Sequence, residues 1–186
     1  IYGRCHGIDI RNYGSGNSGT TNTLRVLGKK AGYITYVGDA LKAILAILFV
    51  RYVVFSSILT PVMDYQLILA YTGLGVTLGH NYPFFLGFKG GKWIAATSGV
   101  MLAMDIRIGL IGFAAFGILF FTTRYVSVGS LVMTLLFPIC VLIFYPGEWH
   151  LFVVSVIFWA MAWIRHRSNI VRLMNGTENR FDKKKK

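Results

Sequence analysis

The run from Val126 to Phe144, VSVGSLVMTLLFPICVLIF, carries no charged side chain and is long enough to cross the hydrocarbon core of a bilayer as an α-helix. Further apolar runs lie on both sides of it. The 186 residues are 55% hydrophobic and 15% aromatic, with a mean hydropathy of +0.59, which is unlike an ordinary soluble domain. The sequence therefore predicts an all-α, polytopic membrane protein with one domain over residues 1–186.

Six membrane-spanning helices are predicted when the apolar runs are followed outward from this one. They cover Tyr33–Phe55, Leu67–Gly79, Ile94–Ile106, Ile108–Phe121, Val126–Phe144 and Trp149–Ile164. A turn over Ser56–Gln66 joins the first two. Two of the six runs are short, because a helix of that length reaches about 20 Å and the hydrocarbon core is roughly 30 Å thick.

The positive charges gather in one set of predicted loops. If residues 1–32, 80–93, 122–127 and 165–186 lie on one side of the membrane, that side holds sixteen of the nineteen Lys and Arg residues. Cytoplasmic loops carry such an excess, so we expect these loops and their glycine-rich segments to face the cytoplasm. The net charge of +12 does not point to nucleic acid, because the basic residues follow the apolar runs. The basic tail at 183–186 is expected to lie at a membrane surface.

The cysteines and histidines do not form a recognisable metal motif. Cys5 lies in a polar segment and Cys140 in an apolar run, so no disulfide framework is predicted. Neither cysteine has a His, Asp or Glu at a spacing typical of metal ligands. We expect no metal site.

The first glycine-rich segment is Gly14-Ser15-Gly16-Asn17-Ser18-Gly19-Thr20-Thr21-Asn22, followed by Arg25. Its glycines alternate with short hydroxyl and amide side chains, so backbone N–H groups can turn inward and form a concave site for an anion. Arg25 adds a planar set of donors suited to phosphate oxygens. Residues Arg25 to Lys30 are expected to form a short basic helix at the surface. Taken alone, a segment of this composition is more often an ordinary loop.

Two further polar segments share the same predicted membrane face. Gly79-His80-Asn81-Tyr82-Pro83 is followed by Phe88-Lys89-Gly90-Gly91-Lys92, in which the two glycines allow the backbone to approach a ligand. After the last span, His166, Asn169 and Arg172 are three residues apart and share one helical face. Each segment alone is typical of an interfacial loop or anchor. Together the three are rich in cations and nearly free of carboxylates, which predicts a site for one or two phosphates.

Asp39 and Lys42 place charge inside the first predicted span. They are three residues apart, so they share a helix face and can pair. Charged residues within spans are often functional. Two interpretations of this pair remain open. It either only helps the helix to sit at the membrane interface, or it belongs to the functional site.

With these motifs in order, the chain resembles the bacterial acyl-phosphate:glycerol-3-phosphate acyltransferases (the PlsY family) over essentially all 186 residues. The three polar segments carry the resemblance, and the third extends to Gly176 and Glu178. Asp39 with Lys42 and the segment Arg124-Tyr125-Val126-Ser127 add to it. The resemblance implies seven membrane helices, so we expect one helix to be missing ahead of Ile1.

The resemblance implies an enzyme that moves a fatty acyl group from acyl phosphate to the 1-hydroxyl of glycerol 3-phosphate. The products are lysophosphatidic acid and phosphate, in the first acylation step of phospholipid synthesis. It also implies no metal and no cofactor, a multi-pass protein of the bacterial inner membrane in contact with membrane lipid, and an active site on the cytoplasmic side. The enzyme that makes acyl phosphate is a candidate partner. Because acyl phosphate is already activated, the protein needs mainly to position the substrates and stabilise developing charge.

The same resemblance assigns roles to individual residues. His166 and Asn169 are expected nearest the reacting hydroxyl, with His166 as proton acceptor or orienting donor. Substrate is expected to be held by Ser15, Asn17, Thr21, Asn22, Arg25, His80, Lys89, Gly90, Gly91, Lys92 and Ser127. Ser15 is also a candidate nucleophile for a covalent acyl intermediate, although the reaction does not need one. Glu178 is expected to support Arg172 or Arg180.

Two positions depart from the family pattern, and two other functions remain as alternatives. Trp93 stands where the family usually has a third glycine, and Ala96 stands near a common hydroxyl position. An indole at 93 would either obstruct the approach of phosphate or sit in the headgroup layer. The alternatives are a transporter for a phosphorylated solute, which would place charges near the bilayer midplane, and a non-catalytic membrane scaffold.

Overall fold

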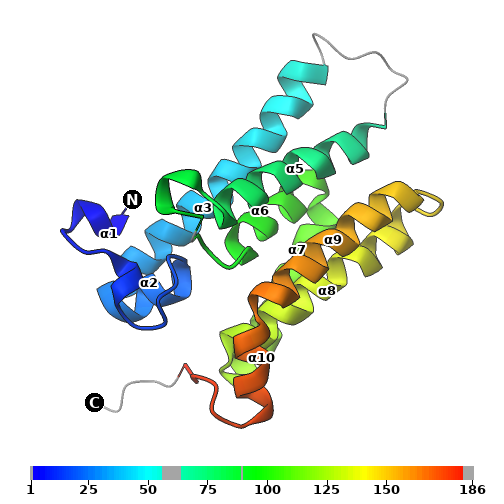
Figure 1. The fold of residues 1–186 in the computed structure, drawn as a ribbon. Helices are drawn as coiled ribbons and strands as arrows, with labels where there is room; N and C mark the ends of the chain where they lie inside the picture. Colours follow the sequence, from blue (N-terminus) through cyan, green and yellow to red (C-terminus); the bar gives the residue numbers. More distant parts are fainter. Residues whose placement is uncertain (1, 56–63, 89, 182–186) are drawn as a thin grey trace.

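The computed structural model describes residues 2–55, 64–88 and 90–181, and within these ranges it contains helices and turns but no strand (Figure 1). The short elements are α1 (Tyr2–Cys5), α2 (Thr20–Leu27), α10 (Arg167–Met174) and the 3-10 turns η1 (Ile10–Asn12) and η3 (Phe84–Leu86). The long helices are α3 (Lys29–Phe49), α5 (Tyr65–Asn81), α6 (Ile94–Met104), α7 (Ile106–Thr123), α8 (Val126–Phe144) and α9 (Trp149–Arg165). A π-helix, η2 (Val50–Val54), continues α3.

The apolar run that predicted the fold class is confirmed as α8, with the predicted bounds. Pro138 lies inside this helix without ending it. Such prolines are tolerated in membrane helices, where neighbouring groups satisfy the freed carbonyl. The last predicted run is confirmed as a helix, α9, to within one residue. The basic tail and most of the predicted turn at Ser56–Gln66 lie outside the described residues.

The prediction of one short basic helix from Arg25 to Lys30 is wrong. Gly28 adopts a φ of +88°, which ends α2 at Leu27, and Lys29 then begins the first long helix. A left-handed backbone of this kind is open mainly to glycine. The turn folds α2 back onto α3, where Gly32 packs so closely against Leu24 that it leaves no room for a side chain. The first long helix therefore starts four residues earlier than predicted.

The boundary between α6 and α7 also differs from the prediction. The break is at Asp105, whose extended backbone ends α6 and whose carboxylate accepts the backbone N–H of Arg107 at 2.9 Å as a cap of α7. The Arg51 guanidinium donates to the carbonyl oxygen of Met104 at 2.8 Å and so satisfies the carboxyl end of α6. As a result α6 is a helix of only 11 residues.

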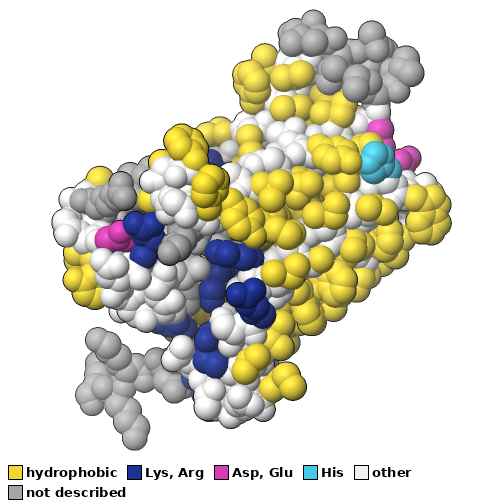
Figure 2. All heavy atoms as spheres, in the orientation of Figure 1, with side chains coloured by type: hydrophobic (Ala, Val, Ile, Leu, Met, Phe, Trp, Pro, Cys, Tyr) yellow, Lys and Arg dark blue, Asp and Glu magenta, His cyan; other side chains and the backbone are white. Residues whose placement is uncertain are grey.

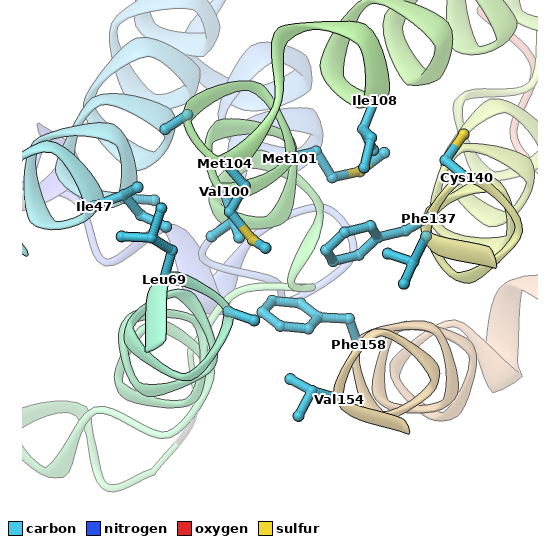
Figure 3. Packing of buried hydrophobic residues seen from close by; sticks show 14 of the residues in the cluster. Ile47, Leu69, Val100, Met101, Met104, Ile108, Phe137, Cys140, Val154 and Phe158 are labelled. Atoms are coloured by element: carbon cyan, nitrogen blue, oxygen red, sulfur yellow. The ribbon is translucent and has the colours of Figure 1, made fainter. Parts of the chain in front are cut away.

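The buried centre of the bundle is α6. Figure 3 shows Val100 and Met104 of this helix between Ile47 and Leu69 on one side and the aromatic rings of Phe137 and Phe158 on the other. The two rings meet edge to face, 5.3 Å apart. Glycines bring the helices close together, since Gly99 of α6 lies against the α3 backbone and Gly73 of α5 lies against α6. Packing of this kind is typical of membrane helices, which associate through small residues.

Two helices, α7 and α8, are long and apolar enough to cross a membrane on their own. The pair α9 and α10 gives a third if it is taken as one span, and it bends by 61° between the two helices. Many large apolar side chains on the outer faces are exposed, as expected for a surface in contact with lipid. The fold is therefore that of a helical membrane protein, and the number of six spans stays a prediction.

The two ends of the bundle differ in charge. Figure 2 shows Lys and Arg side chains gathered at the end where α2 and α10 lie, with acidic side chains beside them at its edge, whereas at the opposite end acidic and histidine side chains appear without such a basic cluster. Between these ends the visible surface is largely hydrophobic. The visible basic side chains are thus concentrated at one end of the molecule, in agreement with the charge asymmetry predicted for its loops.

Candidate active site

A cavity of about 550 Å³ opens at the basic end of the bundle. It is lined from α2, α3, α5, α6, α7, α8 and α10, from the loops before α2 and α6, and from the segment after α10. The predicted residues that line it are Ser15, Asn17, Thr21, Asn22, Arg25, His80, Lys92, Ser127, His166 and Asn169. The three polar segments, far apart in the sequence, therefore meet at one site. Gly90 and Gly91 do not line the cavity, and Lys89 lies outside the described residues.

The first glycine-rich segment is organised around the side chain of Asn22. Its amide oxygen accepts the Ser15 backbone N–H at 2.8 Å and the Ser15 hydroxyl at 3.2 Å. Its amide nitrogen donates to the carbonyl oxygens of Ile10 and Tyr13. Asn22 is fully buried, so these bonds replace its contacts with water. The side chain of Asn22 fixes the loop, and the turn at Gly14 has a φ of +61°.

The loop leads into the amino end of α2, which lines the cavity. Asn17 accepts the backbone N–H of Gly19 at 2.8 Å, and Gly19 is the N-cap residue. The first-turn N–H groups of a helix have no partner within the helix, and the helix dipole makes this end favourable for an anion. Thr21 lies in this turn and Arg25 one turn further, both on the cavity wall. This arrangement suits a phosphate.

The second polar segment presents Lys92 to the cavity. The Lys92 ammonium donates to the amide oxygen of Asn169 at 2.6 Å, across 77 residues of sequence. Burial and the neighbouring Arg172 lower the pKa of Lys92 from its ordinary value. The backbone N–H groups of Gly90 and Gly91 donate to the carbonyl oxygens of Asn81 and His80, at 3.0 and 3.4 Å.

The close approach that these two glycines permit is therefore to the end of α5. A Cβ at Gly90 would overlap the His80 and Asn81 carbonyl oxygens, and one at Gly91 would overlap the His80 ring. The Arg165 guanidinium donates to the Gly91 carbonyl oxygen at 3.1 Å and lies over the Tyr82 ring. The expected approach of backbone to a ligand at these glycines stays a prediction, since neither residue reaches the cavity wall in this structure.

Glu178 is the carboxylate that joins the third segment to the rest of the site. It accepts hydrogen bonds from the Ser127 hydroxyl at 3.1 Å, the Asn169 amide at 2.7 Å and the Arg172 Nε at 2.7 Å. The predicted support of Arg172 is confirmed, while Arg180 lies over the Tyr125 ring instead. Glu178 is buried, and its position connects α8, α10 and, through Asn169, Lys92.

His166 lies at the bend between α9 and α10 and is almost fully buried. Its Nδ1 is 2.8 Å from the carbonyl oxygen of Ala162, which can only accept, so Nδ1 carries the proton and Nε2 keeps its lone pair. Burial lowers the pKa of His166 to about 4, partly offset by the bond to Ala162. The ring is therefore neutral at physiological pH, and its unprotonated Nε2 is available as an acceptor.

His80 and the predicted Asp39–Lys42 pair form a second polar group beside the cavity. The Lys42 ammonium donates to the Asp39 carboxylate at 2.7 Å, which confirms that they pair. The same ammonium is 2.7 Å from His80 Nδ1. An ammonium has no acceptor, so Nδ1 of His80 accepts and Nε2 carries the proton. Asp39 and His80 line the cavity, and the bonds of Lys42 to both of them join α3 to α5.

Sequence reasoning missed the apolar half of the cavity. Phe113, Phe116 and Phe120 of α7 line it together with Met133 of α8 and Ile94 of α6. The three phenylalanines recur every three or four residues and so share a helix face. No sequence signal marked them, because α7 is apolar on every side and its lipid-facing residues look the same. The cavity thus has a cationic half and an apolar half.

Among the described residues, no group of three or more His, Cys, Asp or Glu side chains could hold a metal ion. The cations that line the cavity are Arg25, Lys29, Lys92 and Arg172, and the lining carboxylates are Asp39 and Glu178. Asp39 is already paired with Lys42. The cavity therefore presents an excess of positive charge, which suits phosphorylated ligands.

Comparison with known proteins identifies the family. The family model described as glycerol-3-phosphate acyltransferase matches residues 1–176. The glycerol-3-phosphate acyltransferase of Thermoanaerobacter sp. (strain X514) is 41% identical over 177 residues, which cover 95% of this chain and 84% of the relative. The enzyme of Clostridioides difficile (strain 630) is 40% identical over 183 residues, covering 98% and 86%.

Two solved structures have the same fold. Crystal structures of PlsY (YgiH), an integral membrane glycerol 3-phosphate acyltransferase, match in two forms. The glycerol 3-phosphate form has a TM-score of 0.84 at 35% identity and covers 97% of this chain and 86% of that one. The lysophosphatidic acid form has a TM-score of 0.76 at 36% identity, covering 90% and 81%. The cation-rich, partly apolar cavity, the matching family model and these relatives agree, and the chain belongs to the glycerol-3-phosphate acyltransferase family.

Proposed function

We propose that this protein transfers a fatty acyl group from acyl phosphate to the 1-hydroxyl of glycerol 3-phosphate. The observation that carries the proposal is a single cavity with a cationic half, next to neutral His166, and an apolar half on α7 and α8. The cationic half suits two phosphoryl groups, and the apolar half suits a fatty chain. A related enzyme has been solved in forms with glycerol 3-phosphate and with lysophosphatidic acid, which supports the same acceptor and product.

One phosphate is proposed to bind at the amino end of α2, with Ser15, Asn17, Thr21 and Arg25 around it. The first-turn N–H groups, which have no partner within the helix, and the Arg25 guanidinium supply donors and charge there. The second phosphate is proposed to bind near Lys92. Arg172 belongs to the same group of residues, because Glu178 accepts hydrogen bonds both from Arg172 and from Asn169, the partner of Lys92. Lys89 and Ser127 remain predicted substrate contacts. Holding both substrates in one cavity turns their reaction into an effectively unimolecular step.

His166 is proposed to act as the proton acceptor rather than as an orienting donor. Because Nδ1 donates to the Ala162 carbonyl oxygen, Nε2 is free to accept the proton of the 1-hydroxyl as its oxygen attacks the acyl carbonyl. The new C–O ester bond forms, the bond between the acyl carbon and phosphate oxygen breaks, and inorganic phosphate leaves. Lys92 and nearby cations stabilise the charge that develops on the leaving phosphate. Asn169 holds Lys92 in place.

Direct transfer is favoured over an acyl-Ser15 intermediate. The Ser15 hydroxyl donates to the amide oxygen of Asn22, which cannot take up a proton. A nucleophilic serine needs an adjacent base. Acyl phosphate is reactive enough without this step.

The basic end of the molecule is proposed to face the cytoplasm of a bacterial inner membrane. Its excess of Lys and Arg over the opposite end supports this orientation. Both substrates would then enter from the cytoplasmic side, and a separate enzyme that makes acyl phosphate would supply the donor.

A product assay tests the proposed reaction. The protein, reconstituted in lipid vesicles, is given acyl phosphate and labelled glycerol 3-phosphate, and lysophosphatidic acid is measured. Wild type is expected to form product, whereas His166→Ala and Arg25→Ala are expected to lose about 10²-fold or more of the rate. Gly117→Ala is a matched control, because Gly117 lies on α7 with nothing within 4 Å of an added Cβ. Uptake of the solute into vesicles without lipid product would instead favour a transporter.

A further inference from the structure

Trp93 is the largest fully buried side chain among the described residues, and it follows Lys92 directly. It neither obstructs the cavity nor sits in a headgroup layer, the two outcomes expected from the sequence. Its indole lies in the hydrophobic core and is absent from the cavity wall. The backbone at Trp93 has a φ of +77° and a ψ of −33°, a conformation that a bulky residue rarely adopts.

Packing of the indole holds this unusual backbone in place. The Trp93 ring meets the Phe158 ring edge to face with centroids 6.2 Å apart, and Phe158 in turn meets Phe137. The indole N–H is buried and has no hydrogen-bond partner among the described residues. A left-handed non-glycine residue and an unsatisfied buried donor both cost free energy. The packing contacts of the Trp93 ring must therefore outweigh the cost of the positive φ and of the unsatisfied N–H. Residues strained in this way cluster at functional sites.

The backbone contacts on the two sides of Lys92 show what the buried Trp93 indole does. On the amino side, the loop is held by the Gly90 and Gly91 N–H groups and by Arg165 on the Gly91 carbonyl oxygen. On the carboxyl side, the next residue is Trp93, whose carbonyl oxygen accepts the N–H of Thr97 as α6 begins. The direction in which the Lys92 side chain leaves the backbone depends on the dihedral angles of both neighbours.

We propose that Trp93 is a positioning residue for Lys92: its buried indole locks the backbone at 93 and thereby aims the Lys92 ammonium at Asn169 and the cavity. The inference rests on the proposed function, in which Lys92 binds a phosphate. Phe158 is on α9, eight residues before His166, which is about 12 Å along a helix. The same aromatic contact therefore ties the loop that carries Lys92 to the helix that leads to His166.

A double-mutant cycle on ligand binding tests the proposal. Binding of labelled acyl phosphate, whose phosphate is the one proposed to lie at Lys92, is measured without glycerol 3-phosphate, using the purified full chain in lipid nanodiscs, for wild type, Trp93→Ala, Lys92→Met and the double variant. Trp93→Ala is expected to weaken binding about tenfold, and to have no further effect once Lys92 is already Met, because residues that act through one another are not additive. Trp93→Phe, which keeps an aromatic ring in the core, is expected to recover most of the affinity.

Phe88 provides the matched control. It lies in the same loop and also has a left-handed backbone, with a φ of +60°, but its side chain is 64% exposed. Phe88→Gly relieves a similar backbone conformation without removing a buried ring, and is expected to bind the ligand as wild type does. Trp93→Gly is expected to bind as weakly as Trp93→Ala, which separates the loss of the ring from the relief of strain.

Three results would overturn the proposal. If Trp93→Ala binds the ligand like wild type and only its thermal stability is lowered, Trp93 has a packing role and no role in positioning Lys92. If the fold-losses of affinity caused by Trp93→Ala and Lys92→Met multiply in the double variant, Trp93 affects binding independently of Lys92. If Lys92→Met binds the ligand like wild type, Lys92 does not bind a phosphate. That result would count against the proposed function itself, and the single variant is enough to show it. If Trp93→Ala does not fold, Trp93→Leu takes its place in the same cycle.

Discussion

The two ends of this molecule use charge in opposite ways. At the end away from the cavity, the Asp105 carboxylate accepts the Arg107 guanidinium at 2.6 Å and the Tyr145 hydroxyl at 2.8 Å, so its charge is neutralised where it stands. At the cavity, Glu178 is surrounded by several donors, and the lining cations outnumber the carboxylates. Charge that is paired one to one holds helices in place, whereas charge in excess remains available for a ligand.

The pKa values reflect this difference. Hydrogen bonds from Arg107 lower the pKa of Asp105 to about 2, and burial and the Asp105 carboxylate raise the pKa of Tyr145 to about 12. These shifts hold both groups in the charge state that the pairing needs. At the cavity, burial lowers the pKa values of Lys92 and His166, which disfavours their charged forms until an anion arrives. At the far end the Asp105 carboxylate and the Arg107 guanidinium are partners within the chain, whereas four cations and two carboxylates among the described residues line the cavity.

The largest effect is expected from removing a cation at each end. Lys92→Met should lower product formation by about 10²- to 10³-fold, the usual cost of losing a group that stabilises developing charge. Arg107→Met, the same change at the far end, should leave the specific rate unchanged. Rates of lysophosphatidic acid formation at saturating substrate measure both. Equal losses in the two variants would refute the distinction between the ends.

A smaller loss is expected for Glu178→Gln. The variant keeps the shape of the side chain but removes the charge that Arg172 meets and weakens the acceptor for Ser127 and Asn169. Asn169 and Lys92 should then be held less well, so kcat/KM is expected to fall about 10- to 100-fold, as for other supporting groups around a reactive centre. Steady-state kinetics with both substrates varied measures this. A variant as fast as wild type would remove Glu178 from the organisation of the site.

The titration of His166 gives a third comparison. Because its pKa in the folded protein is about 4 and its ordinary value is 6.5, the ring should stay neutral as pH falls through 6. The unfolded chain binds the proton first, so the stability present above pH 6.5 should be lost progressively as pH falls towards 4. NMR of ¹⁵N-labelled histidine follows the ring directly, with its signal assigned by its loss in His166→Gln. A ring that titrates near 6.5 would contradict the buried, neutral base.

The smallest effect is expected for Asp105→Asn at the far end. The change weakens the cap of α7, the Arg107 ion pair and the Tyr145 hydrogen bond. The cost should be about 1–2 kcal/mol of stability, typical of a lost cap or hydrogen bond, with no change in the rate of acyl transfer. Thermal unfolding in detergent and the product assay together check it. A slower enzyme of normal stability would mean that the two ends are coupled.

Features that depend on neighbours in sequence were predictable. The uncharged run of α8, the Asp39–Lys42 pair and the Arg172–Glu178 pair follow from composition or from residues a few positions apart, and all three are confirmed. Features that depend on distant neighbours were not. The apolar wall of Phe113 and its neighbours looks like any lipid-facing helix until α8 is seen opposite it.

The sequence by itself determined that this is a helical membrane protein with its cations on one side, because length, hydropathy and charge distribution act locally along the chain. Only the tertiary structure decided what each polar residue does. It buries Asn22 within its own loop, turns Gly90 and Gly91 towards the end of α5, and places Trp93 in the core rather than on the cavity wall. The physical reason is that a buried polar group or a left-handed backbone is specified by the contacts that compensate it, and these come from segments up to 77 residues away.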